Sequence, residues 1–491
     1  MRRVVAPLLA VTVALVLADS AVVTLALPDI LQHLDASVTE VAWVLISFNL
    51  VLGVAAVPSA ALLRWMSPRV LGAVGIAAFA GASAWCAAAG SIEILILARC
   101  IQALGGALAL VACLELMVAV WGRQRGVAIW IGAGVVGTAF GPVAGGLLTQ
   151  AISWQAIFVV QVPFAVLAVP AALAIRIPRT PPPPERHRPA LLPNLTLALL
   201  SAALTAALFL LVLLLVEGWR HSPATAAVTV SVVAIAALVS APLARLLAPP
   251  VEVEVATGCL LVAGGLAGLA LLPSSHLGWT IAPQALVGLG LGLTVDRLTV
   301  VAMEMRLPRP RHAAWTISAR HLGVVLGLLI LTPVFTHDLQ DAEEPAQEAI
   351  TSLVIDAPLK AEDKIALARR LSDELEGQRG QVPDLHPAFE KVKVEPREKP
   401  ALADLEAALT LQLERAATHA FRDSFLIGGG LALLALLTVL IPRRRTRAAM
   451  PPPPHGPPSP APPPQPPTVV PAPPPPHVAP PTVITPPEQA P

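Results

Sequence analysis

The sequence has 491 residues, of which 55% are hydrophobic and only 13% are charged, and its net charge is +1. The apolar residues fall in blocks of about twenty, which is long enough to cross a hydrocarbon layer of about 30 Å as helix, so the composition predicts an all-α polytopic membrane protein. The neutral balance and the lack of a basic cluster with interleaved aromatic residues exclude nucleic acid as a partner.

Twelve apolar blocks are predicted to span the membrane, in two sets of six. The first block resembles a signal peptide. Its apolar run continues to Leu27, however, and more spans follow, so it is predicted to be the first membrane helix. The blocks lie near 4–27, 41–63, 70–90, 92–120, 126–149, 156–175, 195–216, 224–247, 256–272, 279–303, 313–335 and 424–441.

Arginines in the short loops predict the orientation. Arg64, Arg69, Arg123 and Arg125 lie in loops that alternate with loops poor in basic residues, and Arg306 continues the pattern in the second half. By the positive-inside rule, both termini are expected to be cytoplasmic, in a plasma or inner membrane.

Three segments outside the spans complete the predicted domain organisation. Residues 1–175 and residues 195–336 with 424–442 form two six-helix bundles, and the proline-rich stretch 176–194 forms a stiff cytoplasmic linker. Residues 337–423 hold nineteen Asp and Glu against eleven Lys and Arg, and two parts of this segment have helical periodicity. We therefore expect an extracytoplasmic helical insertion between the last two spans, and a disordered proline-rich cytoplasmic tail at 443–491.

A glycine stripe marks the fifth span. Gly137, Gly141 and Gly145 recur every four residues, so they form one smooth face of a helix, and Pro142 beside them removes a backbone hydrogen-bond donor. Ordinary close packing of small residues is one interpretation. The other is a moving contact between the two bundles, in which case a bulky residue at Gly145 would impair transport more than folding.

Ionisable residues inside the spans are candidates for function, because burial of a charge in hydrocarbon costs several kcal/mol. Asp19 lies about 22 Å along the first span, and Arg99 lies about 20 Å from the inner face of the layer, so the two are expected at similar depth. An acid facing an arginine across a cavity could exchange a proton for a cationic substrate. A static ion pair is the alternative.

A second set of charges lies in the later spans. Asp296 and Arg297 are adjacent, so they face different sides of their helix and each needs its own partner; Glu304 lies seven residues from Arg297, and Arg320 lies on the next span. These residues predict either a second proton site or a structural network. Glu115 is expected to be solvated at the cytoplasmic end of its span.

No enzymatic motif is present in the sequence. Phosphate-binding GxxxxGK[ST] loops, HExxH, paired Cys/His spacings and GxSxG are all missing, so we expect no enzyme activity, no cofactor and no metal site. Without a nucleotide site, transport would have to run on an ion gradient.

The combined motifs resemble the drug-proton antiporter branch of the major facilitator superfamily, of EmrB/QacA type. The stripe from Gly137 through Gly141, Pro142 and Gly145 to Gly146 looks like its antiporter motif on the fifth helix. Four further stretches are similar to motifs of this branch: Asp19–Pro28, Arg99–Gly106, Trp154–Pro163 and Arg320–Gly323. The loop after the second span departs from the family pattern and keeps only Arg64.

The resemblance implies two six-helix bundles that rock about a central site. It also implies roles for the polar residues of the spans: Asp19, Arg99, Asp296 and Arg320 would couple protons to substrate, and Asn49, Gln102 and Gln161 would line the substrate cavity.

The resulting hypothesis is a proton-coupled exporter of amphipathic or cationic small molecules. A transport-poor receptor or scaffold that acts through the outer segment and the proline-rich tail is an alternative from a different class, and uptake by proton symport is a third. The tail could bind an SH3-like partner or serve only as a linker.

Overall fold

The computed structural model describes residues 2–177, 187–303, 306–341, 343–377, 385–390, 392 and 397–441. The linker residues 178–186, Glu304 and the predicted tail lie outside these residues. Helices account for nearly all of the described chain, and twelve of them within it are long and apolar enough to cross a membrane. The prediction of an all-α polytopic membrane protein with twelve spans is therefore confirmed.

The first six spans form the N-terminal half. Their helices are α1 (Arg2–His33), α2 (Val38–Leu62), α3 (Pro68–Ala87), α4 (Ile92–Trp121), α5 (Arg123–Ala151) and the broken sixth span α6 (Ala156–Val159) with α7 (Gln161–Ala174). Short polar turns separate them. For example, Ser37 Oγ accepts a hydrogen bond from the Glu40 N–H at 3.3 Å while the Glu40 carboxylate accepts from the Ser37 N–H at 2.8 Å, a capping box that starts α2.

The second six spans form the C-terminal half. The seventh span joins α8 (Leu191–Thr205), the π-helical turn η1 (Ala206–Leu210), α9 (Leu211–Leu213) and the π-helical turn η2 (Leu214–Gly218). The other spans are α10 (Pro223–Leu247), α11 (Val251–Ala270), α12 (Gly278–Met303), α13 (Arg309–Asp341) and α18 (Arg422–Leu440).

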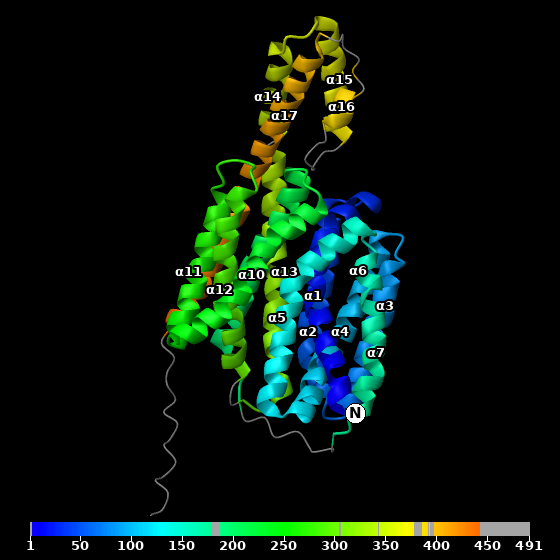
Figure 1. Ribbon diagram of the computed structural model, residues 1–491, viewed down its shortest axis with the longest axis vertical. Coiled ribbons are helices and arrows are strands. Elements are labelled where there is room, and N and C mark those ends of the chain that lie inside the picture. Colours follow the sequence, from blue (N-terminus) through cyan, green and yellow to red (C-terminus); the bar gives the residue numbers. More distant parts are fainter. Residues whose placement is uncertain are drawn as a thin grey trace, which may run out of the picture. The chain divides into compact units, whose positions relative to one another are not determined.

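Four helices lie between the last two spans: α14 (Glu343–Asp356), α15 (Ala361–Gly377), α16 (His386–Glu390) and α17 (Lys399–Ala420). They stand together at one end of the bundle, which we call the insertion end (Figure 1). A small apolar core of their own holds them together, built around Ile350, Leu367, Phe389 and Leu409. The two stretches with predicted helical periodicity lie in α15 and α17.

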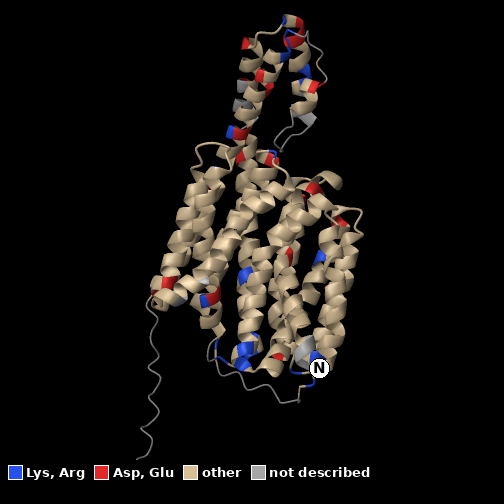
Figure 2. Ribbon diagram, viewed as in Figure 1, with Lys and Arg blue, Asp and Glu red and all other residues tan. Residues whose placement is uncertain are grey.

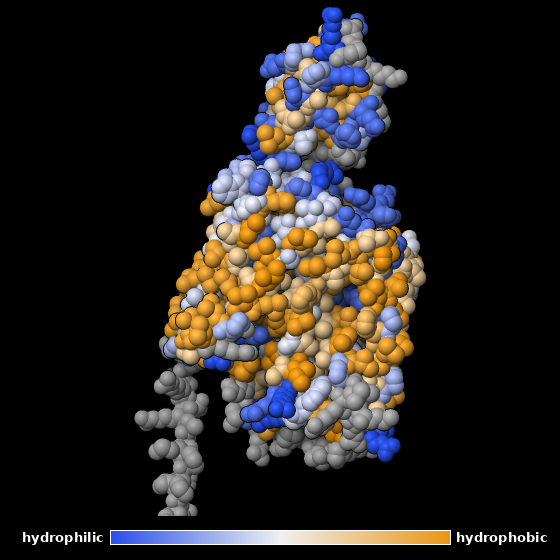
Figure 3. All heavy atoms as spheres, viewed as in Figure 1, coloured by the Kyte–Doolittle hydropathy of each residue, from blue (hydrophilic) through white to orange (hydrophobic). Residues whose placement is uncertain are grey.

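Charge and hydropathy are segregated along the bundle. Figure 2 shows the charged residues gathered at the two ends and over α14–α17, with few between. We call the end that holds Arg64, Arg69, Arg123, Arg125 and Arg309 the arginine-rich end. Between the ends, the visible face of the spans is covered by apolar side chains (Figure 3), as expected of a surface in contact with lipid.

The two halves pack against each other through two pairs of helices, α2 with α13 and α5 with α10. Ser318 Oγ of α13 donates to the Gly53 carbonyl of α2 at 2.6 Å, and the Ala224 N–H of α10 donates to Gln150 Oε1 of α5 at 2.8 Å. The N-terminal and C-terminal halves are thus joined at each of these two helix pairs.

Candidate functional site

The predicted meeting of Asp19 and Arg99 occurs in the structure. Asp19 of α1 and Arg99 of α4 form a direct ion pair, and both side chains are fully buried. The two residues were expected to face each other across a cavity, but they are in contact. The polar pair lies in the middle of the N-terminal half, between the helices of a single bundle.

Two glutamines complete the environment of the Asp19 carboxylate. Gln102 Nε2 donates to Asp19 Oδ1 at 3.2 Å, and Gln161 Nε2 donates to the same oxygen at 3.0 Å. Gln102 Oε1 in turn accepts from Arg99 Nη1 at 2.7 Å. Asp19, Arg99, Gln102 and Gln161 therefore form one buried cluster, which we call the Asp19 network.

Arg99 also reaches the second helix. Its Nε donates to the Val44 carbonyl of α2 at 3.4 Å, and its guanidinium lies 4.0 Å from the ring centre of Phe48. Cation–π contacts of this kind are worth up to about 2 kcal/mol when they are shielded from water. The arginine thereby connects α1, α2 and α4.

The Asp19 network is not fully satisfied. Among the described residues, Arg99 Nη2 and Gln161 Oε1 are buried without a hydrogen-bond partner. A buried ion pair repays its desolvation only when the remaining protons and lone pairs are also satisfied. Stabilisation of the fold alone therefore does not account for this buried ion pair.

A second polar cluster links the two halves. Oδ1 of Asn49 on α2 lies 2.7 Å from Nδ1 of His321 on α13. The same Asn49 oxygen accepts a hydrogen bond from Ser20 Oγ of α1 at 3.2 Å. Because Oδ1 is an acceptor in this arrangement, His321 Nδ1 carries the hydrogen. His321 was not predicted as a site residue, although an imidazole inside an apolar span beside Arg320 was a usable signal.

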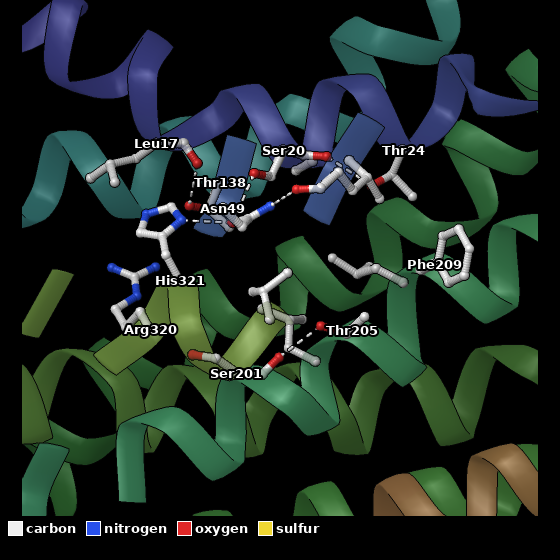
Figure 4. A pocket seen from close by; sticks show the side chains of 15 residues that line it. Leu17, Ser20, Thr24, Asn49, Thr138, Ser201, Thr205, Phe209, Arg320 and His321 are labelled. Carbon is white, nitrogen blue, oxygen red and sulfur yellow. Dashed lines mark hydrogen bonds between the residues drawn. The ribbon is translucent and has the colours of Figure 1, made fainter. Parts of the chain in front are cut away.

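This second cluster borders a cavity between the halves (Figure 4). The cavity offers about 80 Å³ to water-sized molecules, room for only a few waters. Helices α1, α2 and α5 line one side, and the seventh span and α13 line the other. The lining residues are Leu17, Ser20, Ala21, Thr24, Leu45, Asn49, Thr138, Ser201, Leu204, Thr205, Leu208, Phe209, Arg320, His321 and Val324.

Of the three residues that were predicted to line the cavity, only one does so. Asn49 lines the cavity, as expected, but Gln102 and Gln161 do not, because both are turned into the Asp19 network. The hydroxyl residues of the lining were missed, namely Ser20, Thr24, Thr138, Ser201 and Thr205. Single hydroxyls in apolar helices often bond their own backbone, so the sequence alone did not distinguish them.

Arg320 and Asp296 differ from Asp19 and Arg99 in their position relative to the cavity and in their pairing. Arg320 lines the cavity, whereas Asp296 on α12 does not. Their charges interact, but they form no ion pair within the described part of the chain. Arg297, the neighbour of Asp296, pairs with Glu254 of α11 at 3.2 Å. This contact lies within one half and fits the structural-network interpretation of that residue.

The glycine stripe of α5 packs mainly within its own half. A side chain at Gly137 would overlap with the Ala14 carbonyl of α1, and one at Gly145 would overlap with the Val22 carbonyl of the same helix. At Gly141, a Cβ atom would lie 3.0 Å from Ala21 Cβ. The prediction that the stripe packs against the second half is wrong for these three glycines.

Gly146 does face the second half. A Cβ atom there would overlap with Ala227 of α10 and lie 2.8 Å from the Pro223 carbonyl. Adjacent helical residues point about 100° apart, so Gly145 and Gly146 meet different neighbours. Pro142 lies inside α5 and is buried.

Glu115 is also not simply solvated. At the arginine-rich end, its carboxylate pairs with Arg309 Nη1 at 3.4 Å, so α4 of one half is joined to α13 of the other. Both side chains are less than one-third exposed. This is an ion pair across the interface, at the end where the loop after the second span has lost the family pattern.

We expect Arg309→Gln to loosen this end of the interface. A partly exposed pair of this kind contributes about 0.2–1 kcal/mol, so solvent access to the cavity from the arginine-rich end should rise by up to about fivefold. The measurement is the labelling rate of a Ser201→Cys reporter by a membrane-impermeant maleimide. Arg297→Gln, which breaks an ion pair within one half, is the matched control, and equal labelling rates in the two variants would contradict the gating role.

Twelve apolar helices in two halves, with a small cavity between them, define the fold of a secondary transporter. The family model described as Major Facilitator Superfamily matches residues 9–331. The chain belongs to this superfamily.

Curated relatives match about a third of the chain. The tetracenomycin C resistance and export protein of Streptomyces glaucescens is 37% identical over 169 residues, which are 34% of this chain and 31% of that protein. The multidrug efflux pump LfrA of Mycolicibacterium smegmatis is 34% identical over 159 residues, or 32% of each chain. Each match thus spans about a third of the relative.

Solved structures share the fold. A bacterial homologue of the human lysosomal transporter Spinster, in an inward-facing and unoccupied conformation, superposes with a TM-score of 0.57 at 17% identity, over 89% of this chain and 98% of that one. A D-xylose–proton symporter has a TM-score of 0.54 at 12% identity, over 66% and 88% of the two chains. At these identities, the similarity concerns the fold alone.

Proposed function

We propose that the protein exports amphipathic small molecules in exchange for protons, with Asp19 as the acid that couples the two movements. The observation that carries the proposal is the position of the Asp19 network beside the cavity. Asp19 lies in the network and its neighbour Ser20 lines the cavity, while Phe48 stacks on Arg99 and its neighbour Asn49 lines the cavity. In α1 a network residue, and in α2 a residue that contacts the network, is thus followed directly by a cavity residue.

This arrangement supports a simple coupling step. A proton on Asp19 would cancel its charge and weaken its hold on Arg99. Because Arg99 also holds the backbone of α2, its release would free α1 and α2 to shift, and Ser20 and Asn49 would shift with them at the cavity. In the present conformation Asp19 has no contact with solvent, so proton exchange requires the halves to move.

The names of the relatives support export as the direction of transport. The orientation proposed with it places the arginine-rich end in the cytoplasm, both termini on that side and α14–α17 outside an inner membrane.

The test is substrate-dependent proton movement by the purified full-length protein in proteoliposomes. With a pH gradient imposed and a panel of cationic, neutral and acidic amphipathic compounds, at least one compound should accelerate proton flux above that of empty vesicles. Dissipation of the pH gradient should stop uphill movement of that compound. Proton flux that no compound changes would reject the proposal.

A further inference from the structure

The cavity between the halves has charge of one sign. Among its fifteen lining residues, Arg320 carries a full positive charge, and none is Asp or Glu. Asp19 does not line the cavity, and Arg99 already neutralises it. A cation in this cavity would meet the like charge of Arg320 without a facing carboxylate, which is unfavourable in a site shielded from water.

The charge of Arg320 is available for a ligand. Three other arginines of the membrane helices are committed, because Arg99 pairs with Asp19, Arg297 with Glu254 and Arg309 with Glu115. Arg320 forms no ion pair among the residues that the structure describes, and Asp296, the acid whose charge acts on it, stays outside the cavity lining. A partly buried guanidinium without a carboxylate partner is suited to bind an anionic oxygen.

The charged residue and the aromatic residue of the lining lie towards opposite ends of the cavity. Figure 4 shows Arg320 and His321 towards one end, where Leu17 also lies, and Phe209 at the other, near Thr24. Leu204 and Leu208 accompany Phe209 in the lining, while Ser201 and Thr205 contribute hydroxyl groups. The π-helical turn η1 carries Leu208 and Phe209 into this position. The lining therefore matches a molecule with a polar head and an apolar body, which would enter when the halves open the cavity beyond its present volume of about 80 Å³.

We propose that the transported molecule carries an acidic group, a carboxylate or an ionised phenol or enol, which Arg320 binds while the apolar body lies against Phe209. This inference rests on the proposed export function and narrows its substrate class, away from the cationic compounds that the sequence suggested. It assigns Arg320 to substrate recognition and leaves Asp19 as the proton-coupling group.

The experiment compares three probes that share one apolar body: 2-naphthylacetate, its neutral amide, and a naphthylmethyl trimethylammonium ion. Binding to the full-length protein is measured by calorimetry in detergent, and uptake of each labelled probe is measured in proteoliposomes. One charge-assisted hydrogen bond predicts about 10- to 100-fold tighter binding of the acid than of the amide. The ammonium ion should bind most weakly of the three.

Variants then assign the preference to one side chain. Arg320→Gln should bring the acid to the affinity of the amide and leave the amide unchanged, and Arg320→Lys should retain part of the preference. Arg297→Gln removes an arginine of the same half that lies outside the cavity, and it should leave all three affinities unchanged. If Arg320→Gln does not fold, Arg320→Lys and the ranking of the probes on the unmodified protein decide the question.

Each result separates this inference from the function on which it rests. Transport of the ammonium ion in preference to the acid would overturn the acidic-substrate inference and leave export intact. An Arg320→Gln protein that binds the acid as tightly as the unmodified protein would overturn the assignment to Arg320. A protein that neither binds nor moves any of the three probes would count against export itself, together with the inference.

Discussion

Asp19→Asn is expected to abolish proton-driven export. The amide cannot take up or release a proton in the physiological range, and it leaves Arg99 buried in the N-terminal half without its counter-charge. Breaking a buried ion pair from one side typically costs about 3–5 kcal/mol. Some of this cost should be recovered, because the oxygen of the introduced amide can still accept a hydrogen bond from the guanidinium. The measurements are uphill transport in proteoliposomes and thermal stability in detergent.

The double variant Asp19→Asn/Arg99→Gln separates coupling from architecture. It removes both charges and keeps hydrogen-bonding groups of similar size, so its stability should return towards that of the unmodified protein, while uphill export stays absent. Glu254→Gln/Arg297→Gln makes the same pair of changes in an ion pair of the C-terminal half and should leave export intact. If the Asp19–Arg99 double variant regained both stability and uphill export, the pair would be a static element of the fold.

Gly145→Leu is expected to destabilise the protein strongly. The position has no room for a side chain, because even a Cβ atom would overlap with the backbone of α1 at Val22, and backbone cannot swing aside as a flexible side chain can. Overpacking typically costs about 1–3 kcal/mol, and this site should lie at the upper end of that range. The expected result is loss of monodisperse protein and a lower melting temperature in detergent, as a defect of the N-terminal half itself.

Two other glycines of α5 provide matched controls. Gly132 has no atom within 4 Å of an added Cβ, so Gly132→Leu should be neutral or slightly stabilising, since leucine favours a helix more than glycine does. Gly146→Leu meets α10 of the other half and should reduce transport more than it reduces stability. Equal stability of the Gly132→Leu and Gly145→Leu proteins would contradict the packing of α5 on α1.

The positions of the spans could be predicted from sequence because they follow from composition alone. A block of about twenty apolar residues has one low-energy arrangement in a bilayer, a helix that satisfies its own backbone. The capping box at Ser37 and the proline after Ser67 place helix starts by equally local rules. Depth along a span is also local, and for this reason the meeting of Asp19 with Arg99 was predictable.

Rotation about each helix axis was not predictable in this way. Gln102 and Gln161 were expected in the cavity, and the structure turns both towards Asp19. Gly137, Gly141 and Gly145 were expected against the other half, and they contact α1. Adjacent residues point about 100° apart, so a rotation by one position exchanges a cavity residue for a buried one.

The sequence by itself determined the class of this protein: a membrane protein with twelve spans in two halves, with its few intramembrane charges at particular depths. Only the tertiary structure decided the partners of the other charges. Arg297 pairs with Glu254 and Arg309 with Glu115, and Arg320 lies beside the cavity without an ion pair among the described residues. The physical reason is that burial is a property of one segment, whereas pairing depends on how several helices are turned towards one another.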